Sequence, residues 1–398
     1  MTLAQHPIGA RAMLSLLCAQ FLSALADNAL LFAAIALLQL QFAPNWQIPL
    51  LQEFFVLAYI VLAPFVGPFA DSYPKGRVML MANAIKLVGA TAMLLGLNPL
   101  VSYGLVGLGA AAYSPAKYGI LSEMVSREHL VKANAFMEGS TIVAILLGAV
   151  VGGFLASKHL SIALLAVCSC YFAAALMNLL IPKLAAFKPV KTFAPIALVQ
   201  HFRQVLVLLI VQRDARLALL GGSVFWGAGA TLRLLLVAWV PVALHNSDIS
   251  LPANLSGVVA IGIAVGAAMA AKFVRLKDVS RVLPVGISIG VLIILFAHTT
   301  NLYIAISLLI LIGAAGGFYV VPLNALLQQC GHSSVGAGNA VAVQNFFENC
   351  CMLLLVGLYV LMERTGLPVV QAATIFGCVI FVSIGLIARA RMRQTSFT

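Results

Sequence analysis

Long apolar runs separated by short polar connections are the feature that most limits what this chain can fold into. Each run is long enough to cross the ~30 Å hydrocarbon core of a bilayer as a helix. The chain is therefore predicted to be an all-α polytopic membrane protein with twelve transmembrane helices. The expected spans are 12–41, 49–70, 78–97, 100–122, 131–156, 160–181, 216–244, 254–274, 282–298, 302–328, 338–362 and 368–388.

Composition supports this reading. Of the 398 residues, 63% are hydrophobic and only 9% are charged, whereas charged residues make up about a quarter of soluble domains. The first run contains Ala24-Leu25-Ala26, which resembles a signal-peptide cleavage site. However, the apolar character continues to Leu40, which is too long for a signal peptide, so an uncleaved first span is expected.

The distribution of Lys and Arg predicts the orientation. If both termini are cytoplasmic, eighteen basic residues fall in inside segments and two, Lys158 and Arg364, fall in outside connections. Basic residues concentrate on the cytoplasmic side of membrane proteins. The net charge of +12 is thus explained by topology, and no nucleic-acid partner is inferred. The inside residues are Arg11, Lys75, Arg77, Arg127, Lys132, Lys183, Lys188, Lys191, Arg203, Arg213, Arg216, Lys272, Arg275, Lys277, Arg281, Arg389, Arg391 and Arg393.

A weak internal repeat divides the chain into two halves. YSPAKYGILSE in the first half matches YVVPLNALLQQ in the second, so that Pro115 corresponds to Pro322, and Asn134 similarly corresponds to Asn339. Two parallel six-helix halves are the plan of the major facilitator transporters. The predicted organisation is an N-terminal bundle at 1–181, a cytoplasmic linker with an amphipathic helix at 182–215, and a C-terminal bundle at 216–398.

The connection between spans 2 and 3, GPFADSYPKGRVML, resembles the major facilitator loop motif at Gly67, Asp71, Gly76 and Arg77. Glycine permits close helix contact, and a carboxylate can hold a helix N-terminus or a basic partner. These four residues are predicted to form a conformational gate. The alternative interpretation is an ordinary basic cytoplasmic turn.

Five ionisable residues lie deep in the spans: Asp27, Lys86, Lys117, Arg233 and Glu348. A central charge costs ~2.5–3.5 kcal/mol on insertion scales, so each needs a partner, a wet cavity or a function. Shifting Asp27 along the sequence by the length of the repeat gives Arg233. The two residues are therefore predicted to face each other across a central cavity. The alternative is a purely structural ion pair. Lys86 is interpreted as a snorkelling or packing side chain.

Five stretches distributed along the chain resemble the bacterial lysophospholipid transporters of the major facilitator superfamily: FLSALADNALLF, GAAAYSPAKYGILSE, FWGAGATLRLLLVAWVPVAL, GGFYVVPLNALLQ and SVGAGNAVAVQNFFEN. The resemblance implies inward, energy-independent flipping of lysophosphatidylethanolamine and lysophosphatidylglycerol across the inner membrane. It implies a separate partner, a cytoplasmic-face acyltransferase/acyl-carrier-protein synthetase, and no cofactor. It also implies a substrate site formed by Asp27, Lys117, Arg233 and Glu348, with cations for the phosphate and carboxylates for the ammonium.

Two other functions are considered. A drug/proton antiporter would use Asp27 or Glu348 as its proton site, and LLGAVVGGF resembles the antiporter glycine motif, although Ala149 replaces its proline. A membrane-embedded acyltransferase is disfavoured because no HxxxxD pattern occurs at any of the seven His. The chain is therefore predicted not to be an enzyme, and no metal-ligand spacing is found.

Overall fold

A computed structural model describes residues 10–43, 47–182, 184, 194–245 and 250–395, and this part of the chain is helical without β-strands. The helices are α1 (Ala10–Leu40), α2 (Gln47–Ser72), α3 (Lys75–Leu94), α4 (Pro99–Met124), α5 (Leu130–Lys158), α6 (Leu160–Leu179), α7 (Pro195–Val211), α8 (Arg213–Ala243), α9 (Ser250–Phe273), α10 (Leu283–Ala297), α11 (Leu302–Ser333), α12 (Ala337–Arg364) and α13 (Val369–Thr395). Short 3-10 helices precede α5 (Arg127–His129) and α10 (Leu276–Val282).

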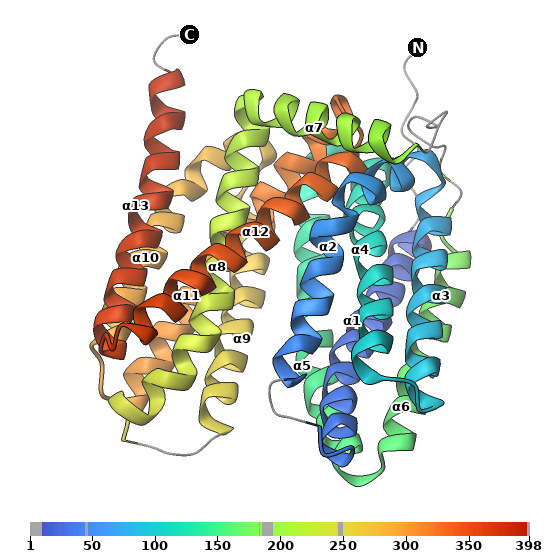
Figure 1. Ribbon diagram of the computed structural model, residues 1–398. Coiled ribbons are helices and arrows are strands. Elements are labelled where there is room, and N and C mark those ends of the chain that lie inside the picture. Colours follow the sequence, from blue (N-terminus) through green and yellow to red (C-terminus); the bar gives the residue numbers. More distant parts are fainter. Residues whose placement is uncertain (1–9, 44–46, 183, 185–193, 246–249, 396–398) are drawn as a thin grey trace. The chain divides into compact units, whose positions relative to one another are not determined.

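Each of the twelve expected spans coincides with one long helix, and Figure 1 shows them in sequence. Within the described residues, eleven helices are long and apolar enough to cross a membrane. The exception is α4, whose 26 residues extend over about 39 Å and so have sufficient length. Its lower hydropathy reflects small and polar residues such as Ser102, Ser114 and Lys117, which are buried within the protein. The fold is thus the expected all-α polytopic one.

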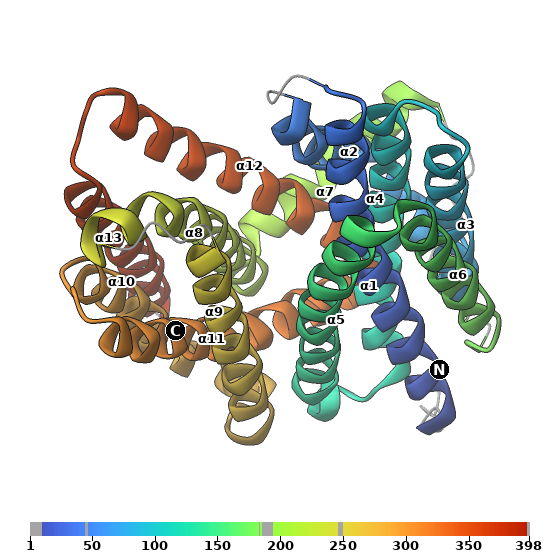
Figure 2. The ribbon, with the colours of Figure 1, turned by 90° about the horizontal axis from the view of Figure 1, so that it is seen from below.

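The described residues form two compact units. The first comprises those of 1–127, 140–208 and 328–346, and the second those of 128–139, 209–327 and 347–398. In the first unit α6 packs against α1 and α3, and α4 packs against α2 and α3 (Figure 2). Its core includes the fully buried Leu30, Met93 and Tyr171.

In the second unit α13 packs against α10 and α8 (Figure 2). Trp239 of α8 is fully buried there. Its ring centroid lies 4.2 Å from that of Phe296 in α10, and its indole N–H donates to the carbonyl oxygen of Ala297 at 3.1 Å. A buried indole needs such an acceptor, so this contact fixes α8 against the end of α10.

The same helix pairings occur in both halves of the sequence, as the internal repeat predicts. In the first half a Cβ on Gly107 of α4 would contact Phe55 and Ala58 of α2. In the second half a Cβ on Gly313 of α11 would contact Val259 and Gly262 of α9. The two contacts lie at matching positions of the repeat, so the repeat is structural as well as sequential.

The contact between α9 and α11 is the closest kind of helix packing. A Cβ on Gly262, Gly266, Gly313 or Gly317 would overlap a backbone carbonyl of the facing helix. Small residues at a spacing of four allow two backbones to approach in this way. The two helices therefore contact each other through their main chains.

The predicted helix of the linker is present as α7. It buries one stripe of side chains, Leu198, Val205 and Leu209, and Phe202 stacks edge-on against Phe346 at 5.5 Å. The other residues of α7 include exposed apolar side chains such as Ile196 and Leu208, as expected for a helix at a membrane interface. Linker residues 183 and 185–193 lie outside the described part of the chain.

Candidate substrate and gating sites

Asp27 lies in the middle of α1 and is held by two other helices of its own unit, α3 and α6. Its Oδ2 accepts from the Lys86 ammonium of α3 at 2.7 Å, and its Oδ1 accepts from the Tyr171 hydroxyl of α6 at 2.7 Å. Lys86 also donates to Ser23 Oγ, one turn before Asp27, at 3.0 Å. Ser23 in turn donates to Asn83 Oδ1 at 2.8 Å. The carboxylate is thus the acceptor at the centre of a connected polar network.

The position of Lys86 corrects the snorkelling interpretation. The residue is only 1% exposed, and its ammonium lies 4.9 Å from the ring centroid of Tyr113 and 5.8 Å from that of Tyr171. A snorkelling lysine would extend its ammonium to water, whereas this one is surrounded by an ion-pair partner and two aromatic faces. Sequence reasoning missed the pair because the two residues are 59 positions apart. The only available signal was that both charges lie at mid-span depth.

The other three predicted substrate residues have different environments. Lys117 of α4 is buried, with its ammonium 4.1 Å from the ring centroid of Tyr118. Glu348 of α12 is buried to a similar extent, at 8% exposure. Arg233 is on an exposed face of α8. Asp27 and Lys117 belong to the first unit, and Arg233 and Glu348 to the second; the facing of Asp27 and Arg233 stays a prediction.

Buried polar side chains also connect helices of the two halves of the sequence. Ser114 of α4 and Asn345 of α12 form a reciprocal pair, with Asn345 Nδ2 donating to Ser114 Oγ at 3.0 Å. Asn324 of α11 donates to Glu138 of α5 at 3.3 Å. The repeat relates α4 to α11 and α5 to α12, so these are equivalent contacts. Asn345 therefore contributes to the contact between α4 and α12.

Asp71 lies at the end of α2 and caps the N-terminus of α12. Its Oδ1 accepts from the Gly338 amide at 2.8 Å, and its Oδ2 accepts from the Asn339 amide at 2.9 Å and from the Asn339 side chain at 2.8 Å. Lys75 donates to the same carboxylate at 3.1 Å. Asp71 thus combines the helix N-terminus and the basic partner that the sequence analysis offered as alternatives.

The remaining gate residues lie around this cap. A Cβ on Gly67 would approach the Asn339 Cα to 2.9 Å, so glycine is what allows α2 to contact α12. Gly76 packs against Ile181 at the end of α6, and Arg77 is exposed. Sequence reasoning missed Glu123 of α4, which pairs with Lys75 of α3 at 2.5 Å and extends the network to a fourth helix.

Comparison with known proteins agrees with this architecture. Residues 16–349 match the Major Facilitator Superfamily. The lysophospholipid transporter LplT of Yersinia enterocolitica is 55% identical over 369 residues, which covers 92% of this chain and 91% of the relative. LplT of Yersinia pestis shows the same identity and coverage. The crystal structure of the human organic anion transporter MFSD10 superposes with a TM-score of 0.77 at 15% identity, covering 95% of this chain and 99% of that one, which is a likeness of fold.

Proposed function

Because the chain belongs to the major facilitator superfamily and, within it, to the lysophospholipid transporters, we propose that it moves lysophosphatidylethanolamine and lysophosphatidylglycerol inward across the bacterial inner membrane. The movement is facilitated and proceeds by alternating access. The observation that carries the proposal is the 55% identity to LplT over 92% of the chain. Ionisable side chains of both signs in the spans supply the matching chemistry.

The head group is bound by Asp27, Lys117, Arg233 and Glu348. A guanidinium can bind two phosphate oxygens at once, and Lys117 adds a point charge. Asp27 is already paired with Lys86, but a carboxylate has about four lone-pair sites and only two are used in the contacts with Lys86 and Tyr171. The Asp27 side chain keeps 20% exposure, against 2% for Lys86. The substrate ammonium can therefore add to the pair without displacing the lysine.

The gate formed by Gly67, Asp71, Gly76 and Arg77 controls conformational exchange rather than binding. The support for this role is that Asp71 connects the end of α2 to the first turn of α12 through three hydrogen bonds. Alternating access requires such contacts to break and form again in each cycle. We further propose the division into 1–181, 182–215 and 216–398, with both termini cytoplasmic. A cytoplasmic-face acyltransferase/acyl-carrier-protein synthetase consumes the product.

The test is reconstitution of the purified full-length chain in liposomes with labelled lysophosphatidylethanolamine in the outer leaflet. Wild-type protein should equilibrate the label between leaflets without an ion gradient. Arg233→Ala should abolish this movement, and Arg233→Lys should restore only part of it, because bidentate geometry is lost. The matched control is Arg364→Ala, which removes an exposed arginine at the end of α12.

Three outcomes would contradict the proposal. Normal flipping by a well-expressed Arg233→Ala variant would remove this residue from the site. Movement that occurs only under a proton gradient would instead indicate the drug/proton antiporter, the second function considered. Acyl transfer by the purified protein would point to an enzyme, contrary to the naming of its relatives as transporters.

A further inference from the structure

Lys86 of α3 is a buried cation to which the transport proposal gives no role. Its side chain is 2% exposed, whereas that of its partner Asp27 keeps 20%. Its ammonium donates to Asp27 Oδ2 at 2.7 Å and to Ser23 Oγ at 3.0 Å, and it lies 4.9 Å from the ring centroid of Tyr113. Carboxylate and hydroxyl oxygens are also ligands that hard metal cations prefer. The ammonium therefore occupies the position that a sodium ion, or a proton on Asp27, would take in its absence.

The neighbouring helix leaves room for the stem of this lysine. A Cβ on Gly109 of α4 would lie 2.7 Å from Lys86 Cγ and 2.7 Å from the carbonyl oxygen of Ala82. Both distances are shorter than carbon atoms tolerate, so α4 can pack this closely against α3 only because residue 109 has no side chain. The packing holds the aliphatic part of Lys86 in place and directs its ammonium to Asp27.

Three tyrosines from two other helices lie close to the same carboxylate. Tyr171 of α6 donates to Asp27 Oδ1 at 2.7 Å, and Tyr103 and Tyr113 of α4 interact electrostatically with its charge. A phenol ordinarily ionises only near about pH 10, so these side chains are neutral donors. In this cluster of described residues, Lys86 carries the positive charge that balances Asp27.

The balanced pair lies inside one compact unit. Helices α1, α3, α4 and α6 all belong to the first unit. Alternating access moves one bundle against the other largely as rigid bodies, so the contact between Asp27 and Lys86 persists through the cycle. Ion-coupled transporters place carboxylates in their spans to bind protons or other cations from solution. Here the fold itself supplies the cation.

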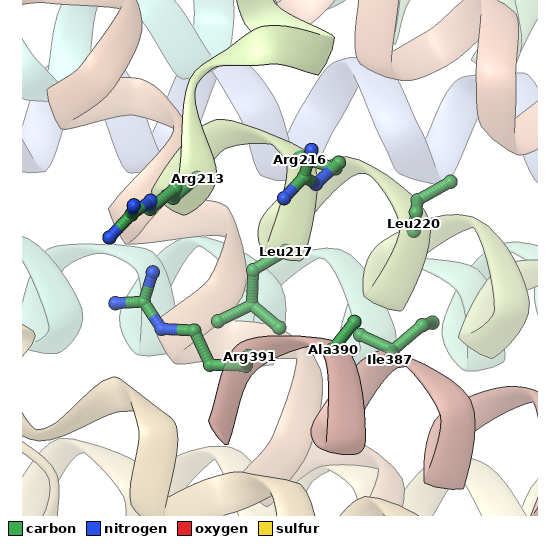
Figure 3. A pocket seen from close by; sticks show the side chains of 7 residues that line it. All are labelled: Arg213, Arg216, Leu217, Leu220, Ile387, Ala390 and Arg391. Carbon is green, nitrogen blue, oxygen red and sulfur yellow. The ribbon is translucent and has the colours of Figure 1, made fainter. Parts of the chain in front are cut away.

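An ion pair at the end of a helix provides a contrast in the second unit. Arg391 of α13 pairs with Asp214 of α8 at 2.5 Å, and the Asp214 side chain is 44% exposed. Figure 3 shows Arg391 beside the start of α8, where the two helices line a small pocket open to the surroundings. Water can solvate the Asp214 carboxylate directly. Asp27 has less than half this exposure and lies at mid-span, so its charge depends on Lys86 for compensation.

We propose that Lys86 is the resident counter-cation of Asp27 and takes the place of a coupling ion, so that this carboxylate binds neither a proton nor an alkali cation from solution during transport. The inference rests on the proposed transport function and gives its independence of ion gradients a physical reason, since no ion has to be bound or released. Lys86 is a positioning residue that acts through Asp27. Its removal should convert Asp27 into a proton site.

The experiment follows protonation of Asp27 by infrared difference spectroscopy, on purified full-length protein without lysolipid, between neutral and mildly acidic pH. Each spectrum is compared with that of the same background carrying Asp27→Asn, so that the other carboxyl groups cancel. The wild type should show no band from a protonated Asp27. Lys86→Met should gain about one protonated carboxyl group per molecule, because a mid-span carboxylate without its cation favours the neutral form. In liposomes, wild-type flipping should not respond to a pH or sodium gradient, whereas flipping by Lys86→Met should become pH-dependent.

Two control variants separate charge from packing. Tyr171→Phe removes the other hydrogen bond to Asp27 but keeps the cation, and Arg391→Met breaks the ion pair at the helix end; neither should gain the Asp27 band. If Lys86→Met does not fold, Lys86→Gln, which keeps a donor without the charge, decides the same question.

The proposal would be overturned by a folded Lys86→Met variant that lacks the band, or by an equal band in Tyr171→Phe. Protonation of Asp27 in the wild type, or a response of wild-type flipping to either gradient, would overturn it as well. Failure of the wild type to move lysophosphatidylethanolamine would instead refute the transport function, because the infrared measurement needs no substrate.

Discussion

Removing the negative charge of Asp71 should release the first turn of α12. Each oxygen of this carboxylate accepts from two donors: Gly338 N and Lys75 on one side, and the main chain and side chain of Asn339 on the other. Asp71→Asn keeps the shape but turns one acceptor into a donor, so two of these four contacts become donor against donor. A hydrogen bond to a charged group contributes ~1.5–3 kcal/mol, and the expected loss is therefore about 3 kcal/mol or more.

This loss has a direct readout in hydrogen exchange. The amides of Gly338 and Asn339 donate to Asp71 itself, so their exchange reports the opening of the cap. A loss of about 3 kcal/mol corresponds to roughly hundredfold faster exchange when opening is a local equilibrium. Lysophospholipid transport in liposomes should slow, while lysolipid affinity should stay close to that of the wild type.

The control is Glu123→Gln, which removes a charge from the same network but leaves the cap of α12 intact. Lys75 bonds to both carboxylates, so exchange at Gly338 should change far less than in Asp71→Asn. The reasoning would be refuted if Asp71→Asn left exchange at residues 338 and 339 unchanged. A large loss of affinity with unaltered transport kinetics at saturation would identify Asp71 as a ligand residue.

Three further predictions concern the contacts around this gate and the Asp27 network. Lys86→Met leaves the Asp27 carboxylate without its cation and should lower the free energy of unfolding in detergent by about 2 kcal/mol. This is less than the ~3–5 kcal/mol typical of a broken buried ion pair, because Asp27 is partly exposed. Adding Asp27→Asn should recover most of the loss, and no recovery would show that the two residues are not paired. Gly67→Ala should slow transport, because its Cβ would lie 2.9 Å from Asn339, whereas Gly357→Ala, with open space around it, should not; equal rates in the two variants would contradict the close contact. Asp27→Arg and Arg233→Asp should each impair insertion or stability, and the double exchange should restore stability more than transport; a double variant no better than the worse single one would show that the two residues do not interact.

The sequence predicted the helices well because apolar length is a local property. The expected run 131–156 and the helix Leu130–Lys158 differ by one residue at the start and two at the end. The expected end of a helix is too early where the helix continues beyond its apolar part into polar sequence. For example, α13 extends to Thr395, past the expected end at 388. Lys and Arg form helices readily, so hydropathy alone does not indicate where such a helix stops.

The sites were predicted in part. The loop motif identified Asp71 because it forms a short pattern within one connection. The partners of a buried charge come from distant sequence, however, and helix adjacency is not encoded in periodicity. For this reason Asp27 was matched by repeat symmetry to Arg233 alone, while its contacts with Lys86 and Tyr171 became visible only with the helices packed. Glu123 was missed for the same reason, since it lies 48 residues from Lys75.

The main-chain contact between α9 and α11 has a consequence for natural and experimental variation. At Gly262, Gly266, Gly313 and Gly317 the smallest side chain would already overlap the opposite backbone, and no rotamer adjustment can relieve such an overlap. Their neighbours Val265 and Leu311 are 47% and 51% exposed and face no such limit. In a deep mutational scan, substitutions should therefore be depleted at every fourth position along the facing sides of α9 and α11, and tolerated at the positions between them. This four-residue pattern of intolerance would locate the same helix pair in distant relatives from the survival of their variants alone.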